Sequence, residues 1–519
     1  MSQINVSNLT FYYEGSFDYI FEEISFSIDT DWKLGFIGRN GKGKTTFLKL
    51  LLGEYEYKGK ISTSTVFEYF PYEMSENQMG SCFVDFMDEL KPDYELWRVL
   101  CELEQLNVDA TILYRPFKLL SHGERTKVML ALLFSGENHF LLIDEPTNHL
   151  DQASREIVKA YLRKKKGFIL VSHDRDLLDA CTNHVLVLNR QTIEVQSGNF
   201  SSWWENKTKK DAFAQMENEK HQKEISKLKE ASKRTRQWAD KNERTKIGFD
   251  PIKEHDRFLD TRAYIGAKTK KMQSRVKQIE QRIDREILEK EGLLQDIERV
   301  LDLKLQPLKH YKEVLITAKH YGLSYKGGNH PVICDFNLEI HQGERVFLNG
   351  KNGCGKSSFI KAVLKNMKKE EDRENDLFIE EGILTTASGM IISYINQDTS
   401  FLKGTIREFC KERQLDETKV CTILRQLDLE RTHFTKDMKD FSEGQKKKVL
   451  IATSIATPAH LYVWDEPLNY IDVFSRMQIE KLLLTYKPTM LVVEHDIRFR
   501  EQVATKVIEM GNQEIKVKD

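Results

Sequence analysis

Residues 38–46 place three glycines, two lysines and two threonines in the spacing G-x-x-x-x-G-K-[ST]. An apolar run, residues 34–37, comes directly before this stretch and predicts a buried strand, and an apolar helical pattern follows it. Glycines let the backbone turn tightly and aim its N–H groups at one point, where a helix N-terminus adds positive potential. The pattern predicts a phosphate-binding loop in which Lys44 reaches the terminal phosphates and Thr45 offers its hydroxyl to Mg²⁺. The loop residues expected to bind nucleotide are Gly38, Asn40, Gly41, Gly43, Lys44, Thr45 and Thr46.

Two carboxylates follow a second apolar run, residues 140–143, at the expected end of a buried strand. Beside a phosphate loop, Asp144 would hold Mg²⁺ and Glu145 would polarise the attacking water. Another apolar run, residues 168–171, ends close to His173, which would contact a terminal phosphate. Taken singly, the carboxylates could be a solvated strand end and the histidine a helix cap. The order and spacing of the whole set favour the catalytic interpretation.

A helix is expected to begin between these motifs, at residues 120–125, and to run to Phe134. Ser121 and Gly123 lie where the start of that helix would present a hydroxyl and backbone N–H groups to an anion. A tyrosine, Tyr13, precedes the phosphate loop.

The second half of the chain repeats these features in the same order. The second copy consists of Tyr325, then Gly350, Asn352, Gly353, Gly355, Lys356, Ser357 and Ser358, then Ser442 and Gly444, then Asp465 and Glu466, and finally His495. The copies differ by a net insertion after the second phosphate loop, which the charged run at residues 365–376 would place in a surface loop. Strands alternating with helices in both copies predict two nucleotide-binding domains of the α/β class.

Composition limits the compartment and the kind of partner. The chain has 519 residues, of which 31% are charged and 40% hydrophobic, and its net charge is −1. The seven cysteines are scattered without a C-x-x-C pair, which argues against a disulfide framework or a zinc site and suits a reducing cytoplasm. The N-terminus lacks a signal pattern, and the longest apolar run, residues 128–134, is too short to span a bilayer. We therefore expect a cytoplasmic protein without a transmembrane segment.

Together these features resemble the ATP-binding cassette superfamily. The resemblance implies that the two domains pair head to tail and enclose two ATP molecules, each between one phosphate loop and the signature motif of the other domain. In that family the helix starts at Ser121 and Ser442 are the signature motifs, and Tyr13 and Tyr325 would stack on adenine. Gln397 would take part in ATP and Mg²⁺ binding. Because both domains lie on one chain, the resemblance implies a monomer, with ATP hydrolysis at both sites.

The first domain departs from the family pattern at Tyr72, where a glutamine is usual. A phenol cannot present an amide carbonyl to Mg²⁺, so the metal geometry of the first site is expected to differ. After the carboxylates, residues 146–151 read PTNHLD whereas residues 467–472 read PLNYID. The two sites are therefore expected to turn over at different rates.

A segment without strand–helix alternation, residues 201–312, joins the two domains. A long polar helical pattern runs to about residue 241 and breaks at residues 247–251, where glycine and a pre-proline position disfavour helix. A second helical pattern follows, with one apolar stripe formed by Met272, Val276, Ile279, Ile283 and Ile287. We expect two long antiparallel helices, held together by this stripe, with a projecting tip near residues 244–264.

The linker is basic although the chain as a whole is not. Residues 207–285 contain 23 Lys/Arg and 13 Asp/Glu, a net charge of +10, so the remainder of the chain carries −11. Aromatic residues lie among these charges, including Trp238 and Phe249. A basic hairpin on an acidic body is the footprint of a phosphate-backbone partner, and aromatic rings could stack on RNA bases. The alternative is a charge run that is only a solvated helix face.

Tandem cassettes joined by a charged helical hairpin, without a membrane domain, resemble the ABC-F proteins. Residues 465–472 and 264–272 are similar to the antibiotic-resistance branch of the Lsa and Vga kind. That resemblance implies binding of the ATP-closed form to the tRNA exit site of the bacterial ribosome, where the hairpin reaches the large-subunit RNA and the P-site tRNA. Lincosamides, pleuromutilins and streptogramin A would be displaced, and hydrolysis would allow release. The tip residues expected to act there are Arg244, Lys246, Phe249, Lys253, Arg257, Phe258, Arg262 and Tyr264.

The sequence therefore predicts two P-loop ATP-binding cassette domains, residues 1–200 and 313–519, joined by a basic helical-hairpin linker, residues 201–312. The alternatives are a housekeeping ABC-F translation factor, the motor subunit of a membrane transporter, and a DNA-repair or chromosome-type ATPase. The basic hairpin argues against the transporter motor, whereas the linker tip and residues 465–472 are all that separates the resistance and housekeeping hypotheses.

Overall fold

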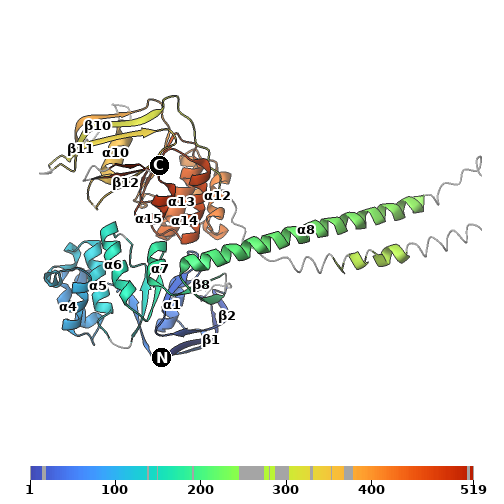
Figure 1. The fold of residues 1–519 in the computed structure, drawn as a ribbon, viewed down its shortest axis with the longest axis horizontal. Coiled ribbons are helices and arrows are strands. Elements are labelled where there is room, and N and C mark those ends of the chain that lie inside the picture. Colours follow the sequence, from blue (N-terminus) through green and yellow to red (C-terminus); the bar gives the residue numbers. More distant parts are fainter. Residues whose placement is uncertain are drawn as a thin grey trace, which may run out of the picture. The chain divides into compact units, whose positions relative to one another are not determined.

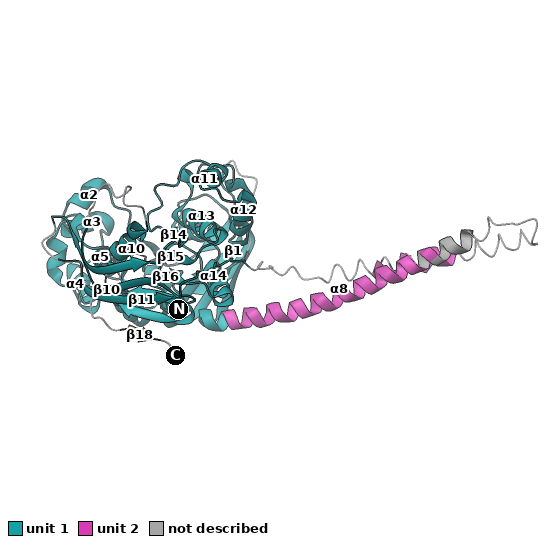
Figure 2. Ribbon diagram, turned by 90° about the horizontal axis from the view of Figure 1, so that it is seen from above, with its two compact units in different colours: residues 1–203, 300–519 teal, residues 204–299 magenta. Residues whose placement is uncertain are grey.

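The computed structural model describes residues 2–14, 19–136, 139–148, 150–189, 192–244, 274–279, 281–283, 285–286, 303–327, 331–351, 353–367, 378–510 and 515–517. It contains two compact units (Figure 2). Unit 1 comprises Met1–Trp203 and Val300–Asp519, and unit 2 comprises Trp204–Arg299. Unit 1 holds both copies of the repeated motifs, here called the first and second repeat.

The first repeat runs from β1 to β9 (blue to green in Figure 1). Its elements are β1 (Gln3–Phe11), β2 (Phe21–Asp29), β3 (Lys33–Ile37), α1 (Lys44–Leu52), β4 (Lys58–Ser62), β5 (Val66–Phe70), α2 (Glu76–Gly80), α3 (Phe83–Leu90), α4 (Leu96–Gln105), η1 (Ala110–Tyr114), η2 (Phe117–Leu119), α5 (His122–Leu133), β6 (His139–Asp144), α6 (Gln152–Lys164), β7 (Phe168–Val171), α7 (Arg175–Cys181), β8 (His184–Leu188) and β9 (Ile193–Ser197).

The second repeat runs from β10 to β18 (yellow to red in Figure 1). Its elements are β10 (Val314–Tyr325), β11 (Ile333–His341), β12 (Arg345–Asn349), α10 (Lys356–Asn366), β13 (Phe378–Thr386), β14 (Ile392–Ile395), α11 (Ile406–Glu412), α12 (Glu417–Gln426), η4 (Arg431–His433), η5 (Met438–Asp440), α13 (Glu443–Ala456), β15 (Leu461–Asp465), α14 (Val473–Tyr486), β16 (Met490–Val493), α15 (Ile497–Val503), β17 (Lys506–Glu509) and β18 (Ile515–Val517).

Both repeats have the same sheet topology, which confirms the α/β prediction. The large sheets have the strand orders β5-β6-β7-β3-β8-β9 and β14-β15-β16-β12-β17-β18, with only the last strand of each antiparallel. Each repeat adds a three-stranded antiparallel sheet, β2-β1-β4 or β11-β10-β13. The central strands β7 and β16 are buried along their whole length, as the continuous apolar runs predict for strands covered on both faces.

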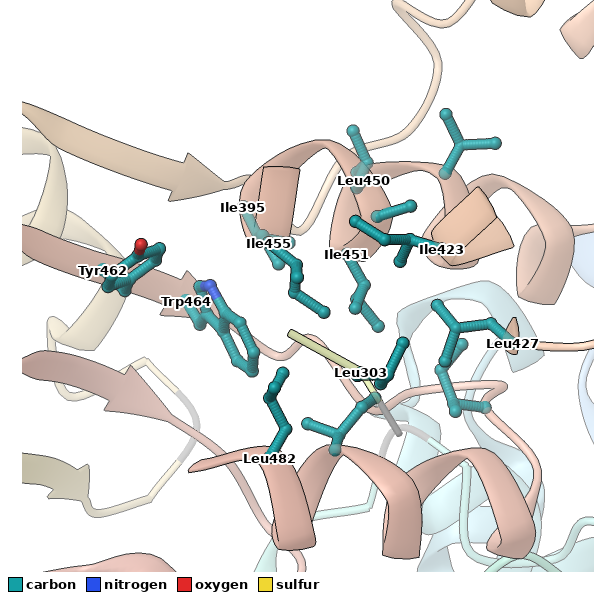
Figure 3. Close-up of a cluster of buried hydrophobic side chains, with 14 of the residues drawn as sticks. Leu303, Ile395, Ile423, Leu427, Leu450, Ile451, Ile455, Tyr462, Trp464 and Leu482 are labelled. Carbon is teal, nitrogen blue, oxygen red and sulfur yellow. The ribbon is translucent and has the colours of Figure 1, made fainter. Parts of the chain in front are cut away.

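Strand β15 illustrates how the core is divided between the two faces of the sheet. Leu461 and Val463 point to one face and pack with the antiparallel sheet and α10. Tyr462 and Trp464 alternate to the other face, where they join the helical core built by α12, α13 and α14 (Figure 3). Both faces are thus packed, and this holds the carboxyl end of β15, which carries the predicted acidic pair, in a fixed position.

The linker begins with one long helix, α8 (Phe200–Arg244), in agreement with the predicted polar helical pattern. Of the predicted second helix, residues 274–279, 281–283 and 285–286 are described, and they are helical. Val276 is buried, but Ile279 is 47% exposed, so the predicted stripe is wrong at Ile279. Ile283, the next member of the stripe, is half-buried, so the spacing alone does not show which of these residues are covered. Leu303 packs in the core of the second repeat (Figure 3).

The predicted break at residues 247–251, Met272, Ile287 and most of the charged run at 365–376 lie outside the described residues. Among the helices that the structure describes, none is long and apolar enough to cross a membrane.

Candidate nucleotide-binding sites

The two phosphate loops turn on glycines in the left-handed region. Gly43 (φ 105°) and Gly355 (φ 97°) immediately precede α1 and α10, and no side chain caps either helix. A Cβ atom on Gly43 would lie 2.5 Å from Ile20 Cγ2, so the loop requires glycine there for space as well as conformation. The uncapped first turn of each helix leaves backbone N–H groups available to an anion, as the motif predicts. Asn352 lies outside the described residues.

Each loop holds its lysine over the turn. Lys44 Nζ donates to Gly38 O and Lys356 Nζ donates to Gly350 O, both at 2.7 Å. Burial lowers the pKa of Lys44, and the nearby carboxylate of Asp472 acts in the opposite direction. Each ammonium group is therefore fixed at the mouth of its loop, where a terminal phosphate would replace carbonyl oxygens as its partner.

A carboxylate from the neighbouring strand faces the hydroxyl group of each loop. Thr45 Oγ1 donates to Asp144 Oδ2 at 2.9 Å. In the second repeat, burial raises the pKa of Asp465 to about 6, although a hydrogen bond with Ser357 opposes the shift. Asp465 Oδ1 is buried without a hydrogen-bond partner. Such a hydroxyl–carboxylate pair, with one buried oxygen left unpaired, fits Mg²⁺, which takes few protein oxygens and completes its shell with phosphate and water.

The candidate catalytic glutamates sit directly after these aspartates in an unusual backbone conformation. Glu145 has φ 51° and Glu466 has φ 48°. Non-glycine residues with positive φ are uncommon, and they concentrate where the fold must aim one side chain. In each repeat the glutamate side chain points towards the predicted histidine: His173 Nε2 lies 3.4 Å from Glu145 Oε1, and His495 Nε2 lies 3.6 Å from Glu466 Oε1.

The two glutamates differ in their remaining partners. Gln397 Nε2 and Asn469 Nδ2 each donate to Glu466 Oε2 at 2.8 Å. Gln397, predicted to contact ATP and Mg²⁺, thus also orients the glutamate. Burial would raise the pKa of Glu466, but His495, Lys447 and Gln397 hold that pKa below its usual value.

Glu145 has no side-chain amide donor among the described residues: its Oε2 accepts from the backbone N–H of His173 at 3.4 Å, and its Oε1 is buried without a hydrogen bond. Burial, together with the charge of Asp144, raises the pKa of Glu145 to about 8. The carboxylate of the first repeat is therefore less firmly oriented and more readily protonated than its counterpart, Glu466.

The sequence analysis singled out Tyr72 in the first repeat, but the aromatic residue that contacts the candidate metal ligand Asp144 is Tyr69, which it missed. Tyr69 OH donates to Asp144 Oδ2 at 3.2 Å. Tyr72 does occupy the position of Gln397, because Phe70 pairs with Ile143 as Ile395 pairs with Trp464. Its hydroxyl is buried, and the residue lines a cavity of about 420 Å³ together with Tyr69, Glu68, Lys91 and His139.

The signature motifs begin helices as predicted. Ser121 and Ser442 accept from backbone N–H groups and cap α5 and α13. Across the repeats, Asn40 Nδ2 donates to Tyr470 O at 2.6 Å. Gly444 lies at the same point, since a Cβ atom there would be 2.6 Å from Tyr470 O and 3.1 Å from Asn40 Nδ2. The second signature motif therefore meets the first phosphate loop.

The reciprocal site is a cavity of about 480 Å³ at the second phosphate loop. Residues of the first repeat, His122 and Arg155, line it opposite Lys356 and Glu466. Tyr325 lines it too, and its hydroxyl lies 2.7 Å from Ser358 Oγ, just as Tyr13 OH lies 2.8 Å from Thr46 Oγ1. Both sites are thus composed of the two repeats. We call the site at the first phosphate loop site 1 and that at the second site 2.

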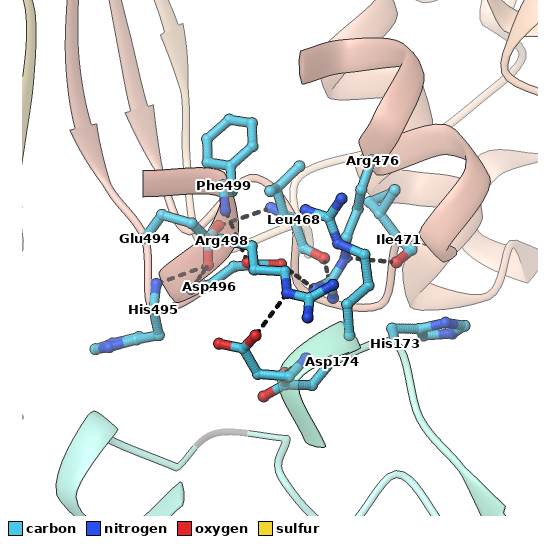
Figure 4. Close-up of polar contacts among 12 residues, drawn as sticks. His173, Asp174, Leu468, Ile471, Arg476, Glu494, His495, Asp496, Arg498 and Phe499 are labelled. Atoms are coloured by element: carbon cyan, nitrogen blue, oxygen red, sulfur yellow. Dashed lines mark hydrogen bonds and ion pairs between the residues drawn. The ribbon is translucent and has the colours of Figure 1, made fainter. Parts of the chain in front are cut away.

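Several charged residues behind the sites carry no motif and were not predicted. Arg476 donates to Asp496 Oδ2 and to the carbonyls of Ile471 and Leu468, each at 2.9 Å (Figure 4). Arg175 of the first repeat forms a bidentate ion pair with Glu480 of the second. The partner of Arg175 lies 305 residues away, so no local pattern could have identified that pair, whereas the partners of Arg476 lie within 20 residues of it.

Substituting Gly444 with alanine is expected to lower ATP hydrolysis about tenfold, because the added methyl group would collide with the carbonyl of Tyr470. Gly80→Ala is the matched control, since its Cβ atom would meet nothing within 4 Å. Gly123→Ala should be milder, because its nearest contact is the Ser154 hydroxyl at 3.1 Å, which can rotate away. Steady-state ATPase assays compare the three. Equal activities of the Gly444 and Gly80 variants would show that turnover does not require this approach.

The predicted linker tip is not placed by the structure. Arg244 is the last residue of α8, and Lys246, Phe249, Lys253, Arg257, Phe258, Arg262 and Tyr264 lie outside the described residues.

Comparison with known proteins agrees with this geometry. The family model described as ABC transporter matches residues 21–148 and 333–469, which include both phosphate loops and both acidic pairs. The chain is 27% identical over 505 residues to the ribosome protection protein VmlR of Bacillus subtilis, covering 96% of this chain and 85% of that protein. It is 27% identical over 526 residues to the ATP-binding protein Uup of Buchnera aphidicola, covering 98% and 80%.

A further relative is ABC transporter F family member 2 of Arabidopsis thaliana, 23% identical with coverage of 98% of this chain and 76% of the relative. Among solved structures, the chain resembles the archaeal ribosome recycling factor aABCE1 in its complex with the ribosomal stalk protein aP1. The TM-score is 0.58 at 17% identity, with 94% of this chain and 85% of that chain covered. This structural likeness supports the fold of the tandem repeats.

Proposed function

Because the chain belongs to the ABC transporter family and is an ABC-F ATPase with two ATP-binding cassettes, we propose that it acts on the bacterial ribosome as an ATP-dependent antibiotic protection factor. ATP and Mg²⁺ are the ligands of its two sites. The finer steps proposed below rest on the composite geometry of those sites and on the exposed charge of α8.

Within each site the proposed roles follow the contacts. Lys44 and Lys356 would hold the terminal phosphates. The rest of each nucleotide would be contacted by Tyr13 or Tyr325 and by the signature residues. Mg²⁺ would be held by Thr45 and Asp144 in site 1 and by Ser357, Gln397 and Asp465 in site 2, where it would neutralise phosphate charge. Glu466 would orient and deprotonate the attacking water in site 2. Glu145 has the same role in site 1 but is a weaker base there, because its raised pKa favours the protonated carboxyl group. His173 and His495 would hold these glutamates in position.

The proposal that the partner is ribosomal RNA rests on the exposed basic surface of α8. Lysines follow one another along this helix with their side chains in solvent, namely Lys209, Lys210, Lys220, Lys223, Lys227, Lys229 and Lys233. The sequence of α8 contains 12 Lys/Arg and 8 Asp/Glu, a net charge of +4. A long exposed helix with this excess of positive charge suits the phosphate backbone of structured RNA better than a protein or lipid core. The relative named as a ribosome protection protein aligns along nearly the whole chain, linker included, which supports the same choice.

In the proposed cycle, ATP draws the two repeats together and this form binds at the tRNA exit site. The linker then reaches the P-site tRNA and the large-subunit RNA, and the tip near residues 244–264 displaces lincosamide, pleuromutilin or streptogramin A drugs. Hydrolysis opens the sites and releases the ribosome. Nucleotide can drive such a cycle only if the two forms differ in their affinity for the ribosome. The protein would act in the cytoplasm as a monomer.

The test is a bacterial cell-free translation reaction inhibited by a lincosamide, to which the purified wild-type protein and ATP are added. We expect translation to recover with the wild type but not with the Glu145→Gln/Glu466→Gln variant, which should remain on the ribosome. Stable ribosome binding without recovery would replace the protection hypothesis with that of a housekeeping factor. Absence of binding, with the protein in the membrane fraction of its host, would favour a transporter motor.

A further inference from the structure

An arginine of the second repeat reaches the point where the linker helix begins. Arg498, in α15, donates through Nε to Asp176 Oδ1 at 2.6 Å and through Nη1 to Ser201 Oγ at 3.2 Å. Its remaining nitrogen, Nη2, donates to Asp179 Oδ2. Both aspartates lie on α7 of the first repeat, and Ser201 lies in the first turn of α8. One side chain therefore joins the second repeat, the first repeat and the root of the linker.

Asp179 is also a structural partner of α8 itself. It accepts from the backbone N–H of Ser201 at 2.7 Å, while Asn199 accepts from the N–H of Ser202 at 3.0 Å. These two side chains satisfy first-turn donors that a helix cannot satisfy internally, and a carboxylate at this end is favoured by the helix dipole. Arg498 and the first turn of α8 both bind the Asp179 carboxylate. A displacement of Arg498 would therefore remove a positive charge from the group that caps the start of α8.

Arg498 lies three residues after His495, the histidine that faces Glu466 in site 2. Between them, Asp496 caps α15 by accepting from Phe499 N at 2.9 Å, and Arg476 holds Asp496 from α14 (Figure 4). His495, Asp496 and Arg498 therefore lie on one hydrogen-bonded turn at the start of α15. Figure 4 shows this turn facing His173 and Asp174 of the first repeat. A shift of His495 when a phosphate binds would be carried directly to Arg498.

The same turn of α8 has a second attachment, which involves the other site. Trp203 is buried, and its ring centroid lies 6.1 Å from that of Phe474 in an edge-to-face contact. Phe474 is in the first turn of α14, and Arg39 of the first phosphate loop lies over its ring at 5.8 Å. The root of the linker thus touches side chains that belong to the surroundings of both nucleotide sites.

We propose that Arg498 is a positioning residue that couples nucleotide binding at site 2 to the root of the linker helix, through Asp176, Asp179 and Ser201. The inference rests on the ATPase sites alone and does not require a ribosome. Charge supports it: Asp176 lies three residues after His173, just as Arg498 lies three residues after His495, so equivalent positions of the two repeats carry opposite charges and face each other.

Amide hydrogen exchange of the full chain tests this coupling, with Glu145→Gln/Glu466→Gln as the parent so that ATP stays bound. In the parent, ATP should slow exchange in residues 200–207 about tenfold. Adding Arg498→Ala should reduce this change to less than about twofold, while ATP still protects residues 38–47 and 350–358. Arg498→Lys should restore part of the effect, because it retains a positive charge beside both aspartates.

Arg500→Gln is the matched control, since Arg500 also lies on α15 but its side-chain hydrogen bonds among the described residues go to Gln152 of the first repeat. It should leave the ATP response of residues 200–207 intact. Asp176→Asn offers a second variant that spares the Asp179 cap, and it should weaken the response partially. The proposal is overturned if Arg498→Ala keeps the full response, or if Arg498→Ala and Arg500→Gln lose it equally. These measurements contain no ribosome, so failure of the ribosome hypothesis would leave them unaffected.

Discussion

Replacing Glu466 with glutamine should lower the rate of ATP hydrolysis about 10²- to 10³-fold, whereas Glu145→Gln should cost much less. Glu466 is fixed by two amide donors at 2.8 Å and a facing histidine, so its carboxylate is oriented and ionised. Glu145 lacks those donors among the described residues, and its raised pKa of about 8 leaves it mostly protonated at neutral pH. Most turnover should therefore take place at site 2.

Single-turnover hydrolysis of radiolabelled ATP by each variant measures this difference directly. Gln397→Ala is the informative control, because it keeps Glu466 but removes one of its hydrogen-bond donors. Its rate of ATP hydrolysis should lie between those of the wild type and Glu466→Gln. If Glu145→Gln reduces the rate as strongly as Glu466→Gln does, the difference in contacts between the two sites has no catalytic consequence.

Replacing Arg175 with methionine is expected to lower the free energy of unfolding by about 3–5 kcal/mol, because Glu480 would be left buried and unpaired. The two side chains are 4% and 5% exposed, and they join α7 of the first repeat to α14 of the second. Both sites are composed of two repeats, so ATPase activity should fall together with stability. Urea denaturation followed by tryptophan fluorescence measures the stability change.

The rescue variant Arg175→Met/Glu480→Leu should recover most of the lost stability, since apolar residues of similar volume can replace a buried ion pair without loss. Arg234→Met is the control, because the Arg234–Glu230 pair is 81% and 71% exposed and should matter by no more than about 0.5 kcal/mol. A double variant no more stable than Arg175→Met would contradict a role for the pair itself.

The phosphate loops, the acidic strand ends and the signature helix starts could be predicted from sequence because each depends on neighbouring residues. Gly43 before α1, the cap of α5 at Ser121 and the buried run of β7 are each determined by residues within a few positions. The paired arrangement of the two sites followed only from the family resemblance, and contacts such as Asn40 with Tyr470 agree with it.

The features that distinguish the two sites could not be predicted in the same way. Tyr69 contacts Asp144 because the register of β5 and β6 places the Tyr69 hydroxyl beside that carboxylate. The family pattern in the sequence points to Tyr72 instead. Arg175 and Arg498 have partners about 300 residues away, and no local pattern identifies them. The stripe through Ile279 failed for the related reason that helical spacing does not define the partner surface.

The central claim is that ATP binding between the two repeats controls attachment to the ribosome. The most direct test is sedimentation of the Glu145→Gln/Glu466→Gln protein with purified bacterial ribosomes, in ATP and in ADP. The account predicts that the protein pellets with ribosomes in ATP and stays in the supernatant in ADP. A protein that remains in the supernatant in both nucleotides, or that pellets equally in both, would contradict it.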